Sequence, residues 1–177
     1  MKSRTFRRMF ALFAQKQISE APKIALLLLV LGLPAVAQKP TIQLIPFTSV
    51  FLPAEAACGF DVLATPQVGR PNKERLIQFN NTAIIAGPLF VTLKNLSTGK
   101  TINLNISGPT RIGFSGTTAQ FLGPFVIPLP ADVATAAGLP LLSLTHGRVV
   151  VTLDQQGNIS SIQSATGTVQ DVCQLLQ

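Results

Sequence analysis

Residues 101–107 read TINLNIS, and this short stretch decides the fold class. Ile102, Leu104 and Ile106 alternate with polar side chains, which is the period of two expected for a β-strand with one wet face. We therefore expect the three aliphatic side chains to face a core and the asparagines between them to face water.

Two hairpins are expected around this kind of strand. Residues 89–94 (LFVTLK) alternate in the same way, and the link 95–100 (NLSTGK) is rich in turn-forming residues. Residues 148–153 and 159–164 form a similar pair, joined by DQQGN at 154–158. Antiparallel hairpins are therefore predicted at both places.

The rest of the body also reads as short strands. Weaker candidates cover residues 60–64, 75–79, 83–86, 111–114, 119–122 and 141–145. One short helix is expected over 130–137, because Pro130 opens it and Gly138 follows its end. Short strands with Gly and Pro between them predict an all-β protein, a single antiparallel β-sandwich, with a small barrel as the alternative.

Charge is concentrated at the N-terminus. Residues 1–37 hold six basic side chains and one acidic one, whereas the rest of the chain holds eight basic and six acidic. The body is therefore close to neutral and lacks the basic stripe of a nucleic-acid-binding domain. We expect no nucleic-acid partner.

The first 37 residues resemble a secretory signal peptide. A basic segment precedes the apolar run IALLLLVLGL at 24–33, and Ala35-Val36-Ala37 supplies an A-x-A cleavage site. The run is shorter than the ~20 residues of a membrane span. We expect cleavage after Ala37, with a rival site near 54–57, and a secreted protein without a transmembrane span. Residues 38–57 are then an apolar tail or the first strand, and 58–177 form the β-sandwich domain.

The chain has two cysteines, Cys58 and Cys173, which bracket most of the body. In an oxidising compartment such a pair is expected to form one disulfide, here between the terminal strands of the sandwich. Metal ligation and a reactive thiol are the alternatives, and both are weak because the spacing is not Cys-x-x-Cys and His146 is the only histidine.

No catalytic constellation stands out, so no catalytic, cofactor or metal residue is assigned. His146 follows an apolar stretch and reads as a structural histidine. The disulfide would bring Asp61 and Asp171 near each other, and a carboxylate pair can serve a glycosidase. The simpler interpretation is that both carboxylates cap turns beside the disulfide. The sequon asparagines, among them Asn95, are read as by-products of strand alternation and turns.

The segment 112–130 (IGFSGTTAQFLGPFVIPLP) carries no charge and three phenylalanines, Phe114, Phe121 and Phe125. The default interpretation is core strands joined by turns. The alternative is an exposed apolar surface that binds a partner.

The start Cys58-Gly59-Phe60-Asp61-Val62 and the end Asp171-Val172-Cys173 resemble those of small secreted bacterial proteins of unknown function, of the kind found in soil actinobacteria. This resemblance implies a secreted all-β domain with a terminal disulfide and assigns no activity.

The expected function is therefore a secreted, non-catalytic β domain that binds a protein, an apolar partner or a second copy of itself. Sugar binding is a poor version, because the chain contains no Trp and no Tyr. The alternative is a small secreted hydrolase that uses His146 or a carboxylate pair. No cofactor is expected.

Overall fold

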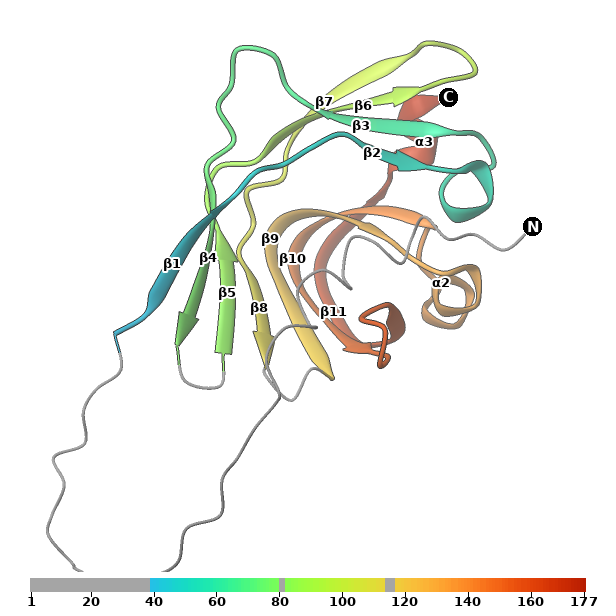
Figure 1. Cartoon of the computed structure of the whole chain (residues 1–177). Coiled ribbons are helices and arrows are strands. Elements are labelled where there is room, and N and C mark those ends of the chain that lie inside the picture. Colours follow the sequence, from blue (N-terminus) through green and yellow to red (C-terminus); the bar gives the residue numbers. More distant parts are fainter. Residues whose placement is uncertain (1–38, 80–81, 114–116) are drawn as a thin grey trace, which may run out of the picture.

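The computed structural model describes residues 39–79, 82–113 and 117–177. They form two antiparallel sheets and three short helices, as expected for an all-β chain (Figure 1). The sequence-predicted β-sandwich is confirmed, and the two sheets do not close into a barrel.

The large sheet has seven strands in the order β1-β4-β5-β8-β9-β10-β11. Its strands are β1 (Thr41–Ile45), β4 (Glu74–Phe79), β5 (Thr82–Ala86), β8 (Thr110–Gly113), β9 (Thr118–Pro128), β10 (Leu142–Leu153) and β11 (Ile159–Asp171). The small sheet has four strands in the order β2-β3-β6-β7. These are β2 (Val50–Leu52), β3 (Val62–Pro66), β6 (Phe90–Asn95) and β7 (Thr101–Asn105).

The helices are short and lie at connections or at the end of the chain. They are the 3-10 turn η1 (Ala54–Ala56), α2 (Ala131–Ala137) and α3 (Val172–Leu176). Helix α2 confirms the helix expected from Pro130 and Gly138, and Gly138 ends it in the left-handed conformation with φ of 63°.

The first hairpin is confirmed in β6 and β7, where Val91 pairs with Leu104 and Leu93 with Ile102. The apolar alternation of β7 also holds. Ile106 is buried and Leu104 is half-buried against the same core, while the asparagines of the strand are exposed.

Two expected strands turn out to be one. Residues 141–145 and 148–153 belong to the single strand β10, and β11 runs well past residue 164 to Asp171. The described part of 38–57, expected as a tail or first strand, supplies β1 to the large sheet and β2 to the small one.

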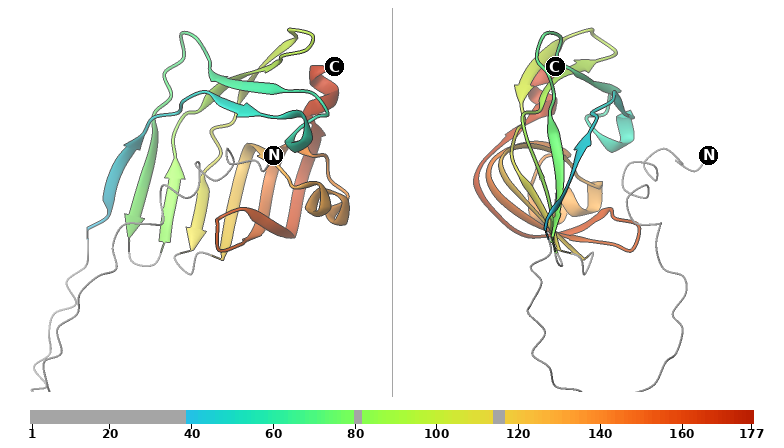
Figure 2. Two further views of the ribbon diagram at one scale, coloured as in Figure 1. Left: turned by 45° about the vertical axis from the view of Figure 1, so that its right-hand side comes forward. Right: turned by 60° about the vertical axis from the view of Figure 1, so that its left-hand side comes forward.

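Two hydrophobic cores lie on opposite faces of β10. Leu142 and Leu144 pack into the first core, together with the small sheet and α3. Val149 and Val151 pack into the second core, together with α2. Because the β9–β10 register is unbroken, even- and odd-numbered residues point to opposite faces. The sandwich is therefore confined to one end of the long strands, and α2 lies on the concave side of β9–β11 (Figure 2).

Three glycines meet where β10 passes from the first core to the second. Gly147 of β10 pairs with Gly123 of β9 and with Gly167 of β11. A Cβ added at Gly147 would lie 2.9 Å from the Cα of Gly167, inside the distance that real Cβ atoms keep. The backbones of β10 and β11 can approach this closely only because Gly147 and Gly167 both lack side chains.

Candidate functional site

One face of the large sheet contains the candidate site. Direct cross-strand pairs share a face, so the registers define a single row through all seven strands. The row runs Ile42, Ile77, Ile84, Arg111, Gln120, Val150 and Ser164. We call the face that carries this row the outer face. The term covers only the part of that face that the small sheet leaves uncovered.

The two faces of the large sheet differ sharply in burial. The next row, on the opposite face, includes Leu76, Thr110, Phe121 and Val149, which are between 2% and 7% exposed. Every member of the outer row is half-buried or exposed. The outer face is therefore available to a partner.

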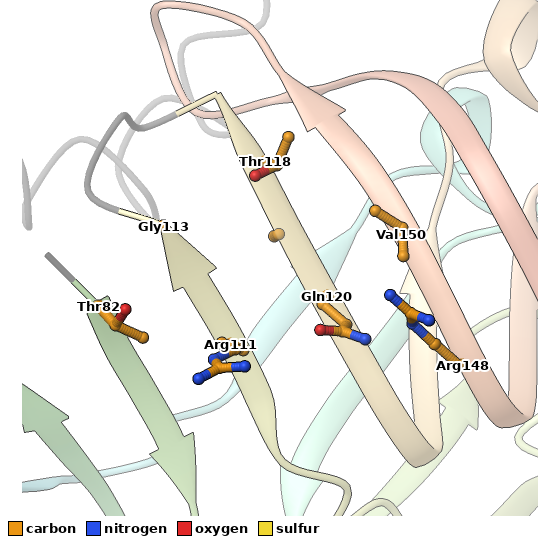
Figure 3. A pocket seen from close by; sticks show the side chains of 8 residues that line it. Thr82, Arg111, Gly113, Thr118, Gln120, Arg148 and Val150 are labelled. Carbon is orange, nitrogen blue, oxygen red and sulfur yellow. The ribbon is translucent and has the colours of Figure 1, made fainter.

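A pocket lies in the middle of the outer face (Figure 3). Its volume is about 210 Å³, and β5, β8, β9 and β10 supply its walls. The lining residues are Thr82, Arg111, Gly113, Thr118, Ala119, Gln120, Arg148 and Val150.

Gln120 lies between the two arginines of the pocket (Figure 3). It pairs directly with Arg111 on β8, and Arg148 is its diagonal neighbour on β10. Oxygen and nitrogen of an amide are assigned from their hydrogen-bond partners. With its oxygen toward Arg148, Gln120 accepts from Nε and from Nη2, the latter at 3.1 Å. This contact orients the Arg148 guanidinium on the rim of the pocket.

The pocket is positively charged and rich in hydrogen-bond donors. Arg111 and Arg148 are the only charged residues among the eight that line it, and Thr82 and Thr118 add hydroxyl groups. A guanidinium presents a planar fork of N–H donors that fits a carboxylate or phosphate group. The arrangement is suited to holding an anionic group.

His146 is exposed and does not line this pocket. On β10 it pairs with Pro124 and Thr168, so neither direct cross-strand neighbour offers a carboxylate to orient its ring.

Asp61 and Asp171 each have a structural role. Oδ1 of Asp61 accepts from the backbone N–H of Ala54 at 2.9 Å, at the start of η1. Oδ1 of Asp171 accepts from the N–H of Cys173 at 2.8 Å and caps α3. Both carboxylates therefore follow the capping interpretation rather than that of a catalytic pair.

The phenylalanine surface considered for segment 112–130 is not found at the two described positions. Phe121 is 7% exposed, and Phe125 packs against the same second core. Their ring centroids are 4.6 Å apart. Phe121 faces inward from β9 because its odd-numbered position lies on the buried side of the strand. Phe114 lies outside the described residues.

The predicted disulfide is present. Cys58 and Cys173 are bonded with a Cα–Cα distance of 5.1 Å. The bridge does not join two strands, because Cys58 follows η1 and Cys173 lies in α3, just after the last strand. It ties the segment before β3 to the C-terminal helix.

Sequence analysis did not single out Arg111, Gln120 or Arg148. Each stands at an outward position of its own strand, and the sequence shows the alternation of inward and outward residues within each strand. What brings them together is the register of β8, β9 and β10, which a single strand pattern does not encode.

Within residues 39–79, 82–113 and 117–177, no group of three or more His, Cys, Asp or Glu side chains could hold a metal ion. No helix in the described part of the chain is long and apolar enough to span a membrane.

Comparison with known proteins gives no relative. No protein family, no curated protein and no solved structure matches this chain. The function must therefore be argued from the outer face itself.

Proposed function

We propose that this protein is an exported, non-catalytic binding domain that holds an anionic group of its partner between Arg111 and Arg148. One observation carries the proposal. Two guanidinium groups flank Gln120 in a pocket whose lining contains no carboxylate.

Electrostatics favours an occupant of negative charge. Arg111 and Arg148 stand on either side of Gln120, and an anion bound in the pocket would be attracted by both positive charges. An anion would also accept hydrogen bonds from the arginines and from Thr82 and Thr118. Charge-assisted hydrogen bonds of this type are stronger than neutral ones.

The chemistry of the lining favours binding over hydrolysis. Its polar side chains are arginines, an amide and hydroxyls, and none of these is a base at neutral pH. Export is supported by the leader pattern of residues 1–37 and by the Cys58–Cys173 disulfide, since disulfides persist in oxidising compartments.

Inorganic phosphate is a suitable first probe. We expect titration of the protein with phosphate to shift the NMR signals of the Arg111 and Arg148 Nε–H groups and of the Gln120 side chain. Arg111→Gln and Arg148→Gln should each weaken this binding about ten-fold, the lower end for a hydrogen bond to a charged group.

Lys100→Gln is the charge-matched control. Lys100 is exposed in the turn between β6 and β7 and does not line the pocket, so its removal should leave phosphate affinity unchanged. Two results would refute the proposed site. One is a set of NMR shifts spread evenly over all basic side chains, and the other is an Arg111→Gln variant that binds phosphate as well as the parent does.

A further inference from the structure

We infer that the partner of the outer face is the surface of an anionic lipid bilayer. This inference rests on the proposed function, because the lipid headgroup supplies the anionic group of the pocket. It adds a partner class, which the proposed function leaves open.

The outer face is divided into an aliphatic half and a cationic half. Ile42, Ile77 and Ile84 follow one another across β1, β4 and β5, and Arg111 is the next residue in the same row. Adjacent strands are spaced by ~4.8 Å, so the aliphatic row extends about 14 Å from Arg111. Apolar and anionic parts of a partner would meet at the boundary between β5 and β8.

The far end of the aliphatic half is widely exposed. Ile42 and Leu44 on the edge strand β1 are 59% and 65% exposed. Leu44 pairs with Arg75, so a cation also stands beside the exposed leucine. Aliphatic side chains next to arginines are typical of surfaces that insert at the boundary between headgroups and acyl chains.

The outer face is free of negative charge. Arg75, Arg111 and Arg148 lie on it, and all three are exposed. The carboxylate side chains of residues 39–177 all lie elsewhere. They are Glu55 in η1, Asp61 before β3, Glu74 on the opposite face, Asp132 in α2, Asp154 in the last hairpin and Asp171 beside α3. This distribution complements an anionic bilayer.

The pocket is too small to enclose an organic ligand of drug size. Its 210 Å³ are less than the roughly 300–1,000 Å³ of pockets that enclose a small molecule. It can take one headgroup, while the rest of the partner must lie along the sheet. A bilayer presents anionic headgroups directly above apolar acyl chains, so the cationic and aliphatic halves of the outer face can be engaged together.

A second copy of the chain fits the outer face poorly. In a two-fold dimer the same face meets itself. Arg75, Arg111 and Arg148 would then oppose one another with no carboxylate on either face to neutralise them. The charge pattern therefore favours lipid over self-association through this face.

Vesicle co-flotation tests the inference. The exported protein is used, with its N-terminus checked by mass spectrometry, so that the apolar leader does not itself bind lipid. We expect binding to phosphatidylcholine vesicles that contain phosphatidylglycerol and little binding to pure phosphatidylcholine. Arg111→Gln, Arg148→Gln and Arg75→Gln should each lower the partition coefficient about five-fold. Leu44→Ser should lower it about ten-fold.

Two control variants distinguish binding through the outer face from nonspecific lipid binding. Val68→Ser removes an apolar side chain that is 97% exposed between β3 and β4. Lys100→Gln removes a cation of the turn between β6 and β7. Both should float with anionic vesicles as well as the parent does.

Three results would overturn the inference. The first is phosphate binding in the pocket without vesicle binding, which leaves the proposed function intact. The second is equal binding to vesicles with and without phosphatidylglycerol. The third is a Leu44→Ser variant that binds vesicles like the parent but has a smaller mass in analytical ultracentrifugation. Strand β1 would then be an edge through which the protein self-associates.

Discussion

Asn95 and Leu176 are hydrogen-bonded across 81 positions of the chain, with Nδ2 of Asn95 donating to the carbonyl of Leu176 at 3.1 Å. Oδ1 of the same amide accepts from the N–H groups of Ser97 at 2.8 Å and Thr98 at 3.2 Å. Asn95 is only 2% exposed. One buried side chain thus shapes the turn between β6 and β7 and holds α3 against the small sheet.

Asn95→Ala should destabilise the fold by about 1–3 kcal/mol, because it leaves the carbonyl of the buried residue Leu176 without this donor and removes the acceptor that shapes the turn. Urea denaturation measures this difference. Asn103→Ala is the control. Asn103 accepts from Oγ1 of Thr92 at 2.7 Å on the exposed face of β7, and its loss should stay within about 0.5 kcal/mol. Equal losses for the two variants would contradict the role given to Asn95.

The alternation of β7 predicts unequal effects for neighbouring residues. Ile106→Ala removes a buried side chain of the first core and should cost about 2–5 kcal/mol. Leu104→Ala should cost about 2 kcal/mol, because Leu104 is only half-buried.

Asn105→Thr is the comparison on the exposed side of β7. Asn105 accepts from the N–H of Ser107 at 3.2 Å, which is a local and solvent-exposed contact. The change should cost less than about 1 kcal/mol in thermal unfolding. A larger loss from Asn105→Thr than from Leu104→Ala would mean that the polar side of the strand is covered.

Gly147→Ala tests the close approach of β10 and β11. The new Cβ would lie 2.9 Å from the carbonyl carbon of Thr166 as well as from Gly167, and the backbone must shift to admit it. Such overpacking costs about 1–3 kcal/mol, occasionally more.

Gly138→Asn is the matched control at an open position. Gly138 has a left-handed backbone conformation, which Gly147 does not, but no atom lies within 4 Å of an added Cβ at Gly138. Asparagine tolerates left-handed geometry, so this variant should lose less than about 1 kcal/mol. If Gly147→Ala melts at the parent temperature, the strands are not as tightly apposed as described.

Glu74 makes stability depend on pH in a defined direction. Burial raises the pKa of its carboxyl above the ordinary 4.5, because desolvation disfavours the charged form. The folded state then binds this proton more tightly than the unfolded chain does. The contribution of Glu74 to stability therefore falls as pH rises from below 4.5 through the raised pKa.

Glu74→Gln should consequently raise the melting temperature at neutral pH and make little difference at pH values below 4.5. Melting curves across this range provide the measurement. Glu55→Gln, at an exposed position of η1, is the control. A neutral-pH melting temperature that falls with Glu74→Gln would show that the charged carboxylate is stabilised in the fold.

Local sequence patterns predicted the elements whose signals are local. Alternation in 101–107 and the turn residues at 95–100 were sufficient for β6 and β7, and Pro130 with Gly138 was sufficient for α2. The length of β10 was not predicted, because Gly147 interrupts the pattern. Glycine normally weakens a strand, but any side chain at position 147 would meet the backbone of Thr166 and Gly167 on β11.

The candidate site could not be predicted from local patterns. Arg111 and Arg148 are 37 positions apart in the sequence and have no motif in common. They meet only because β9 lies between β8 and β10, with Gln120 at the corresponding register. Phe121 was considered as a surface residue and is buried. The apolar run around it does not reveal which of its members face inward.

The Cys58–Cys173 bond makes residues 58–173 a covalently closed ring. Val68, which is 97% exposed, lies inside this ring, as does the hairpin turn after β10. A single peptide-bond cut at either place opens the ring but releases no fragment, because the sulfur bridge still joins the two pieces. A protease would have to cut the ring twice before any of the strands β3 to β11 could diffuse away.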